Sequence, residues 1–100
     1  MRVSYSEEEV GALIRDYAAF REKAGTNRAG LRVLVRLIDL ARAMEQLPIK
    51  YRGVVLLYGL LGLSLEETAA LLHVSHQAVS KRYRQGVEDI TFSMNGGYDH

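Results

Sequence analysis

Residues 63–84, LSLEETAALLHVSHQAVSKRYR, decide the fold that we predict for this chain. Ser64 is followed three residues later by Glu67, the spacing of a capping box in which each side chain accepts a free amide at a helix start. A helix should therefore begin at Leu65. Ser75 is a second N-cap, so another helix should follow after a tight turn.

Apolar residues in the same stretch are spaced to hold these two helices together. A helix-turn-helix needs a small residue where its helices cross and apolar residues on both inner faces. The sequence supplies them at Ala69, Leu72, Val74 and Val79. The pattern predicts a helix-turn-helix whose second helix is basic.

The outer face of that second helix, opposite Val79, carries side chains that donate hydrogen bonds to base edges and phosphates. We predict that it enters a DNA groove. Gln77 and Lys81 would contact bases, and His76 and Ser80 would make shorter contacts to bases or backbone. Phosphates would be held by Ser75, Arg82 and Arg84. The plainer alternative is that Lys81 and Arg82 only keep an exposed helix soluble, or that Arg82 turns inward toward Glu66 or Glu67.

Composition narrows the class of protein. The chain has 100 residues, 48% of them hydrophobic, which suits one domain with its own core. It has no cysteine, which excludes disulfides, thiolate metal sites and cysteine nucleophiles. The net charge is only +1, so any DNA affinity must come from local clustering or from a partner.

Hydropathy argues against a membrane protein. The longest apolar run, from Val54 to Leu63, is far shorter than the roughly 20 residues that span a bilayer. The first residues, MRVSYSEEEV, contain no apolar signal segment. We expect no membrane partner and a cytoplasmic location.

Two further helices are expected before the motif. Residues 6–23 form one amphipathic helix, with a capping box at Ser6 and Glu9 and a stripe at Val10, Leu13, Ile14 and Tyr17. Residues 24–30 form a glycine-containing turn. Residues 31–46 form the second helix, whose inward stripe is expected at Leu31, Leu34, Leu37, Ile38, Ala41 and Met44.

A third helix, residues 48–61, follows the Leu47–Pro48 pair, because proline suits a first helical turn. Gly62 should end it in a left-handed conformation. The recognition helix should continue to about residue 93, where Asn95, Gly96 and Gly97 stop regular structure. We thus predict an all-α fold of about five helices, with an N-terminal pair at residues 1–47 for dimerisation or partner binding. Residues 48–93 would bind DNA, and residues 94–100 would form a flexible tail.

Three arginines recur every four residues on one side of the second predicted helix, at Arg28, Arg32 and Arg36. The simple interpretation is a solvated face balanced by Asp39 and Glu45. The alternative is a set of contacts to phosphates or to an acidic partner, since like charges at this spacing repel modestly.

One known family shows the same pattern between Leu47 and Ile90. The shared features are Leu47-Pro48, Tyr51-Arg52, Leu57, Leu61, Gly62-Leu63-Ser64, Glu66-Glu67, Ala69, Leu72, Val74-Ser75, Val79 and Arg82. This pattern resembles region 4 of sigma-70-type factors, the helix-turn-helix domain with which the specificity subunit of bacterial RNA polymerase reads a promoter element. The layout of the N-terminal helices is similar to that of small phage transcription regulators.

The resemblance implies a sequence-specific, double-stranded DNA-binding transcription regulator, acting as a homodimer or together with RNA polymerase. His76, Gln77, Ser80 and Lys81 replace the arginine- and glutamate-rich set of primary sigma factors, which implies a different DNA site. His73 stands where glycine is usual at the turn.

Two other functions remain open at this stage. One is a small terminase-like subunit that recognises DNA for phage packaging, and the other is a module that captures RNA polymerase or a sigma factor.

The sequence gives no sign of a chemical site. His73 and His76 lack a third ligand for a metal, and Ser75 and His76 point apart as helix neighbours, so they do not form a nucleophile and base. No glycine-rich loop follows a strand, as a phosphate-binding loop would. We therefore expect no enzyme activity, no metal and no cofactor.

Overall fold

A computed structural model describes residues 4–24 and 28–97, and this part of the chain contains helices and no strand. The helices are α1 (Glu7–Arg15), α2 (Tyr17–Lys23), α3 (Arg28–Gln46), α4 (Ile49–Val54), the π-helix η1 (Val55–Leu60), α5 (Leu65–Leu72) and α6 (His76–Met94). The all-α prediction is confirmed. The expected number of about five helices was too low, because the described residues form six α-helices and the π-helix.

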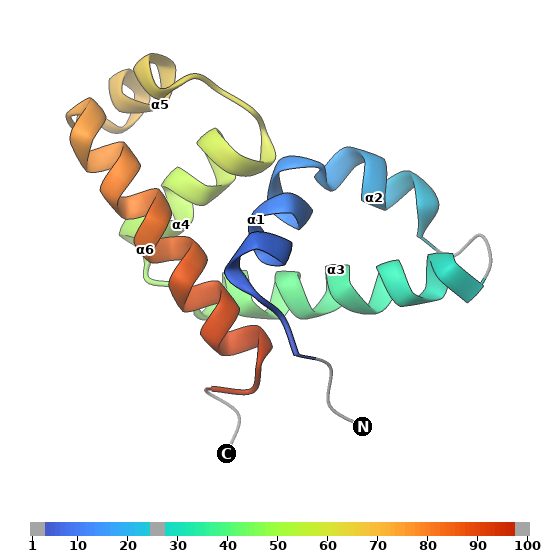
Figure 1. Cartoon of the computed structure of the whole chain (residues 1–100). Helices are drawn as coiled ribbons and strands as arrows, with labels where there is room; N and C mark the ends of the chain where they lie inside the picture. The colour runs from blue at the N-terminus through green and yellow to red at the C-terminus, as the bar shows by residue number, and fades with distance from the viewer. Residues whose placement is uncertain (1–3, 25–27, 98–100) are drawn as a thin grey trace.

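The first predicted helix, residues 6–23, is two helices. Ser6 and Glu9 do form the expected capping box, and α1 buries Val10, Leu13 and Ile14. The chain then bends at Asp16, whose backbone departs from helical values at φ −104° and ψ 25°. After the bend, α2 packs against α3, so the expectation of a single helix over residues 6–23 was wrong (Figure 1).

Helix α3 differs from the prediction in its start and in the face that it buries. It begins at Arg28, and Gly30, expected in a turn, is a buried residue of this helix. Residues 25–27 of the expected turn lie outside the described residues. The inward stripe is formed by Leu40, Ala43 and Leu47, with Leu37 and Met44 beside it. Four residues expected in that stripe are exposed instead, namely Leu31, Leu34, Ile38 and Ala41.

The joint between α3 and α4 is held by one arginine. The Arg52 guanidinium on α4 donates to the backbone carbonyls that end α3, those of Met44 at 3.0 Å, Glu45 at 2.8 Å and Leu47 at 3.0 Å. These carbonyls would otherwise lack partners at a helix end. Arg52 thereby fixes the angle at which the chain turns at Pro48.

The third predicted helix, residues 48–61, is α4 followed by η1. The wider π turn ends with the Leu61 amide bonded to the Leu56 carbonyl at 2.9 Å. Gly62 follows with φ +72°, the left-handed conformation that the sequence predicted. Within η1, Gly59 is buried where α1 and α6 meet, and a Cβ there would lie 2.5 Å from Ile14 Cγ2 and 3.0 Å from Tyr83 Cε1.

Helix α6 is the spine of the molecule, and two apolar clusters share it (Figure 1). The larger cluster joins α1, α3 and η1 to the second half of α6 through Val87, Ile90 and Met94. The smaller cluster joins α4 and α5 to the first half through Val79. The predicted N-terminal pair therefore packs directly on the recognition helix.

The last described residues contact the start of the chain. Met94 is buried in α6, and the Asn95 side chain bonds both backbone groups of Tyr5, at 2.7 Å to its amide and 2.9 Å to its carbonyl. The Tyr5 hydroxyl donates to Asp39 Oδ2 at 2.8 Å, and burial together with this bond raises the pKa of Tyr5 to about 12. Met94 and Asn95 of the predicted tail thus take part in packing, and residues 98–100 lie outside the described residues.

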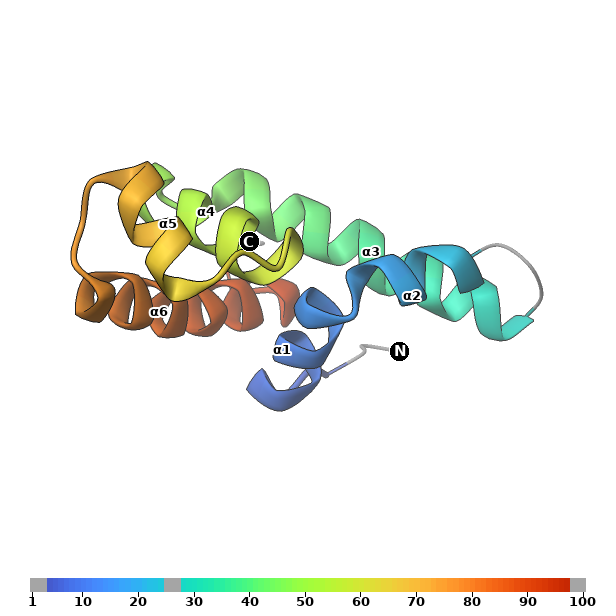
Figure 2. The same cartoon turned by 90° about the horizontal axis from the view of Figure 1, so that it is seen from above.

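The molecule has two distinct ends, visible in two perpendicular views (Figures 1 and 2). One end holds α5 and the start of α6. The other end holds α2 and the N-terminal half of α3, residues 28–38. We call these two helical segments together the arm. Within the described residues, no helix is long and apolar enough to cross a membrane.

Candidate nucleic-acid interface

The helix-turn-helix is built from local capping interactions. The Ser64 hydroxyl accepts the Glu67 amide and the Glu67 carboxylate accepts the Ser64 amide, both at 3.0 Å. The bonds from the Ser64 amide and side chain lower the pKa of the Glu67 carboxyl. The Ser75 hydroxyl accepts the Ala78 amide at 3.0 Å. Both N-caps predicted from the sequence are confirmed.

The turn between the helices is left-handed. His73 ends α5 with φ 55° and ψ 45°. As predicted, it occupies the turn position at which helix-turn-helix sequences usually have glycine. The Val74 amide then bonds the Ala69 carbonyl at 3.1 Å, which closes the turn. Ser75 starts α6 immediately afterwards, so the turn sets the direction of the recognition helix.

The inner faces of the motif pack as predicted, with one polar exception. Val54, Ala69 and Val79 form the buried cluster between α4, α5 and α6, with Leu72 and Val74 packed against it. Thr68 is fully buried beside them, and its hydroxyl has no hydrogen-bond partner within the described structure. Apolar contacts therefore hold α4, α5 and α6 together, and burial of the Thr68 hydroxyl without a partner opposes them.

The outer face of α6 brings five predicted residues together. His76, Gln77, Lys81 and Arg84 are exposed, Ser80 is half-buried, and all five line one hollow of about 510 Å³. Their spacing of four residues places them on successive turns of one helical face. Ser75 lies exposed at the cap just before them. Side chains of these types can donate hydrogen bonds to, and accept them from, the base edges and phosphates of DNA.

Arg82 lies on a different side of α6 from the outer face. It lines a hollow of about 340 Å³ together with Lys50, Tyr51, Ala78, Lys81 and Gln85. Lys81 borders both hollows, so positive charge continues from the outer face to α4. This flank suits a phosphate backbone better than a base edge.

Sequence reasoning missed Lys50. It lies in the first turn of α4 with its ammonium 5.0 Å from the centre of the Tyr51 ring. One feature of the sequence could have indicated it. A lysine in the first turn of a helix, with no acidic residue in that turn, is unfavourable for the isolated helix, so a contact elsewhere would explain its position.

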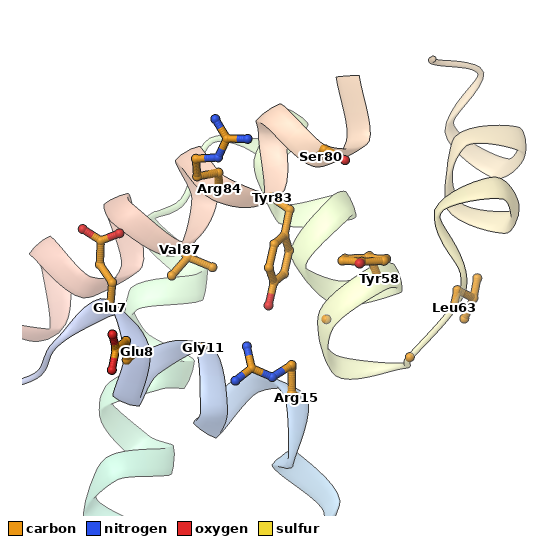
Figure 3. A pocket seen from close by; sticks show the side chains of 12 residues that line it. Glu7, Glu8, Gly11, Arg15, Tyr58, Leu63, Ser80, Tyr83, Arg84 and Val87 are labelled. Atoms are coloured by element: carbon orange, nitrogen blue, oxygen red, sulfur yellow. The ribbon is translucent and has the colours of Figure 1, made fainter. Parts of the chain in front are cut away.

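A third hollow, on the side of the outer face away from Arg82, was also not predicted (Figure 3). It has a volume of about 670 Å³ and shares Ser80 and Arg84 with the outer face, while α1 contributes Glu7, Glu8, Gly11 and Arg15. Arg15 points toward the hydroxyl of Tyr83, whose ring meets that of Tyr58 edge-on at 5.1 Å (Figure 3). Burial raises the pKa of Tyr83, and the Arg15 charge opposes that rise. This hollow depends on α1 meeting α6, which no local pattern reveals.

Arg28, Arg32 and Arg36 are exposed on α3. They lie in the arm, at the far end from the start of α6 (Figures 1 and 2). The structure does not bring them together with the residues of the recognition helix. Among the described residues, no three His, Asp or Glu side chains gather where they could hold a metal ion.

These features define a helix-turn-helix DNA-binding domain. Residues 37–90 match the family described as Sigma-70, region 4, and the chain belongs to that family. The resemblance seen in the sequence is thereby confirmed, and it begins within α3 rather than at Leu47. No curated protein and no solved structure matches the chain.

Proposed function

We propose that this protein is a sequence-specific, double-stranded DNA-binding transcription regulator that inserts the first half of α6 into the major groove. One observation carries the proposal: His76, Gln77, Ser80, Lys81 and Arg84 lie together on an open face of α6 directly after the left-handed turn. A major groove admits one α-helix, and the N-terminal residues of a recognition helix are those that reach base edges.

Each side chain suggests a different contact. A glutamine amide pairs most naturally with adenine, since it can donate to N7 and accept from N6, so we assign Gln77 to a base. Lys81 fits guanine acceptors. His76 and Ser80 are shorter and fit contacts at the groove wall. Because the set differs from the one in primary sigma factors, we propose that its target sequence differs too.

The flanks of the helix suit the DNA backbone. Ser75 lies exposed at the start of α6, where free amides and the helix dipole favour a phosphate. Arg84 on the outer face, and Arg82 with Lys50 on the α4 side, supply three further positive charges. On a chain with a net charge of +1, this local clustering is the main source of attraction to DNA. Such a regulator would act in the bacterial cytoplasm or nucleoid, whether a phage or its host encodes it.

The proposal is tested by selecting bound sequences from random duplex DNA. We expect one short preferred sequence. The Gln77→Ala change should then cost about 1 to 3 kcal/mol on that sequence and relax the preference at one position. Enrichment of no sequence would overturn the proposal, and an equal loss on all sequences would make Gln77 a phosphate contact.

The backbone contacts are tested by salt dependence. The Arg84→Ala change should reduce the slope of log affinity against log salt by about one, because one phosphate contact is lost. Arg21→Ala removes an equal charge from exposed α2 in the arm and serves as the matched control. Equal slopes for both variants would remove Arg84 from the interface.

A further inference from the structure

Helix α3 has an exposed apolar strip on the side opposite its buried stripe. Its members are large aliphatic residues that remain substantially accessible, namely Leu31 (55%), Leu34 (39%), Val35 (49%) and Ile38 (44%). We call these four residues the outer strip. Their spacing of i, i+3, i+4 and i+7 places them on one face of the helix.

The outer strip makes α3 apolar on two sides. Leu40, Ala43 and Leu47 fill the buried side toward α6, so the strip has no part in the core of the chain. A helix that is apolar on two sides is expected to be covered on two sides. Contiguous apolar residues left open on a small domain mark an interaction surface.

The position of the strip shows that it is independent of DNA reading. It lies in the arm, whose other helix, α2, contributes no fully buried residue. The arm points away from α5 and the start of α6 (Figures 1 and 2). A partner on the strip would leave the outer face of α6 open.

We propose that the outer strip is a homodimer interface, in which α3 packs antiparallel against α3 of a second copy. The spacing of the strip is the one that two helices use when they pack side by side with interlocking side chains. A two-fold axis makes the same face complementary to itself. The inference goes beyond the proposed function and does not depend on it.

The charges along α3 select the second copy and its direction. The N-terminal half carries three arginines, Arg28, Arg32 and Arg36, whereas the C-terminal half carries Asp39, Arg42 and Glu45 and is net acidic. A parallel partner would place each arginine beside its own equivalent. An antiparallel partner centred between Val35 and Ile38 places Arg28 of one copy beside Glu45 of the other, at both ends of the contact.

Glu45 is the better acidic partner in this arrangement. Asp39 already accepts the Tyr5 hydroxyl at 2.8 Å, whereas the exposed Glu45 carboxylate faces solvent. The ends of the contact would then be charged and its centre, where Val35 meets Ile38, apolar. Between them, the aliphatic stem of Arg42 would lie against Leu31 of the other copy.

The mass of the free, full-length protein tests the interface directly, without DNA. Sedimentation equilibrium at micromolar concentration should give twice the chain mass of 11.2 kDa. Ile38→Glu should raise the dissociation constant by more than about tenfold, because a charge replaces an aliphatic group in the contact. Ile38→Ser is a milder second variant, and circular dichroism confirms that each remains helical.

Ile49→Glu is the matched control, because Ile49 is 80% exposed but lies on α4, outside the strip. It should leave the dimer intact. A monomeric wild type would overturn the proposal, as would a dimer that Ile49→Glu disrupts and Ile38→Glu does not. A ring of many subunits would overturn it in favour of an assembly for DNA packaging. A monomer that binds RNA polymerase through Ile38 would overturn it in favour of a polymerase contact.

A charge exchange tests the antiparallel direction. Arg28→Glu and Glu45→Arg should each weaken the dimer, and the double variant should recover most of the loss, because the exchanged charges face each other again. Absence of any recovery would overturn the antiparallel arrangement. Failure here leaves the DNA-binding proposal untouched, because selection of DNA sequences reports on α6 alone.

Discussion

The outer strip of α3 and the outer face of α6 are both exposed helical surfaces, but their chemistry is opposite. The first offers Leu31, Leu34, Val35 and Ile38, whereas the second offers His76, Gln77, Ser80, Lys81 and Arg84. Polar side chains are well hydrated in the free protein and can exchange that water for DNA. Aliphatic side chains are unfavourable in water and are stabilised when another protein surface covers them. This contrast supports our proposals that one end of the molecule reads DNA and that the other end associates with a second copy.

Helices α3 and α6, which carry the two surfaces, share one core with α1 and η1. The strongest way to break the comparison is to open that core where α1, η1 and α6 meet. Gly59→Val places a Cβ 2.5 Å from Ile14 Cγ2 and adds two methyl groups. We expect the free energy of unfolding to fall by about 2 to 3 kcal/mol, as for an overpacked core, measured by urea denaturation. Unchanged stability would show that the junction is loose and that the two ends are not rigidly connected.

Gly53→Ala is the matched control for this change. Gly53 is also helical, but a Cβ there lies 3.5 Å from Leu72 Cδ2, an ordinary contact. Alanine favours the helix over glycine by about 1 kcal/mol, so this variant should gain stability or keep it.

A second prediction sharpens the comparison at the end that carries the helix-turn-helix, where a buried polar group weakens the motif. Thr68 is fully buried and its hydroxyl has no partner in the described structure, so Thr68→Val should raise the free energy of unfolding by about 1 to 2 kcal/mol. Thr91→Val is the control. The Thr91 hydroxyl donates to the Val87 carbonyl at 2.7 Å, so the same change should bring no gain. Equal effects at both sites would contradict the assignment.

The smallest effect is expected at the turn before α6. His73 adopts φ 55°, which glycine reaches without the steric cost that a side chain incurs. His73→Gly should raise the free energy of unfolding by about 0.5 to 1 kcal/mol, seen as a small rise in the thermal midpoint. The relief of backbone strain should exceed the cost of the extra freedom that glycine gives the unfolded chain. DNA affinity should not change. A loss of affinity would make the His73 side chain part of the reading surface.

Features set by neighbouring residues were predictable from the sequence. The capping boxes at Ser6 and Ser64, the left-handed Gly62 and the cap at Ser75 all follow from interactions within about four residues, and the structure contains each of them. The clustering of His76, Gln77, Ser80, Lys81 and Arg84 on one face likewise follows from helical periodicity.

Features set by distant contacts were not predictable. Helix α3 has two apolar stripes, and only its packing on α6 decides that Leu40 lies inside and Ile38 outside. The bend at Asp16 is tied to the way α2 crosses α3. The approach of Arg15 to Tyr83 joins residues from opposite parts of the chain and left no mark in either local pattern.

The central claim, that the outer face of α6 reads a DNA sequence, is tested most directly by a ratio of affinities. The wild type and the Gln77→Ala/Lys81→Ala double variant are titrated with the selected duplex and with a scrambled duplex at one salt concentration. The wild type should prefer the selected duplex by about a thousandfold or more, and the double variant should lose at least about tenfold of that preference. Equal wild-type affinity for both duplexes, or an unchanged preference in the double variant, would contradict the claim.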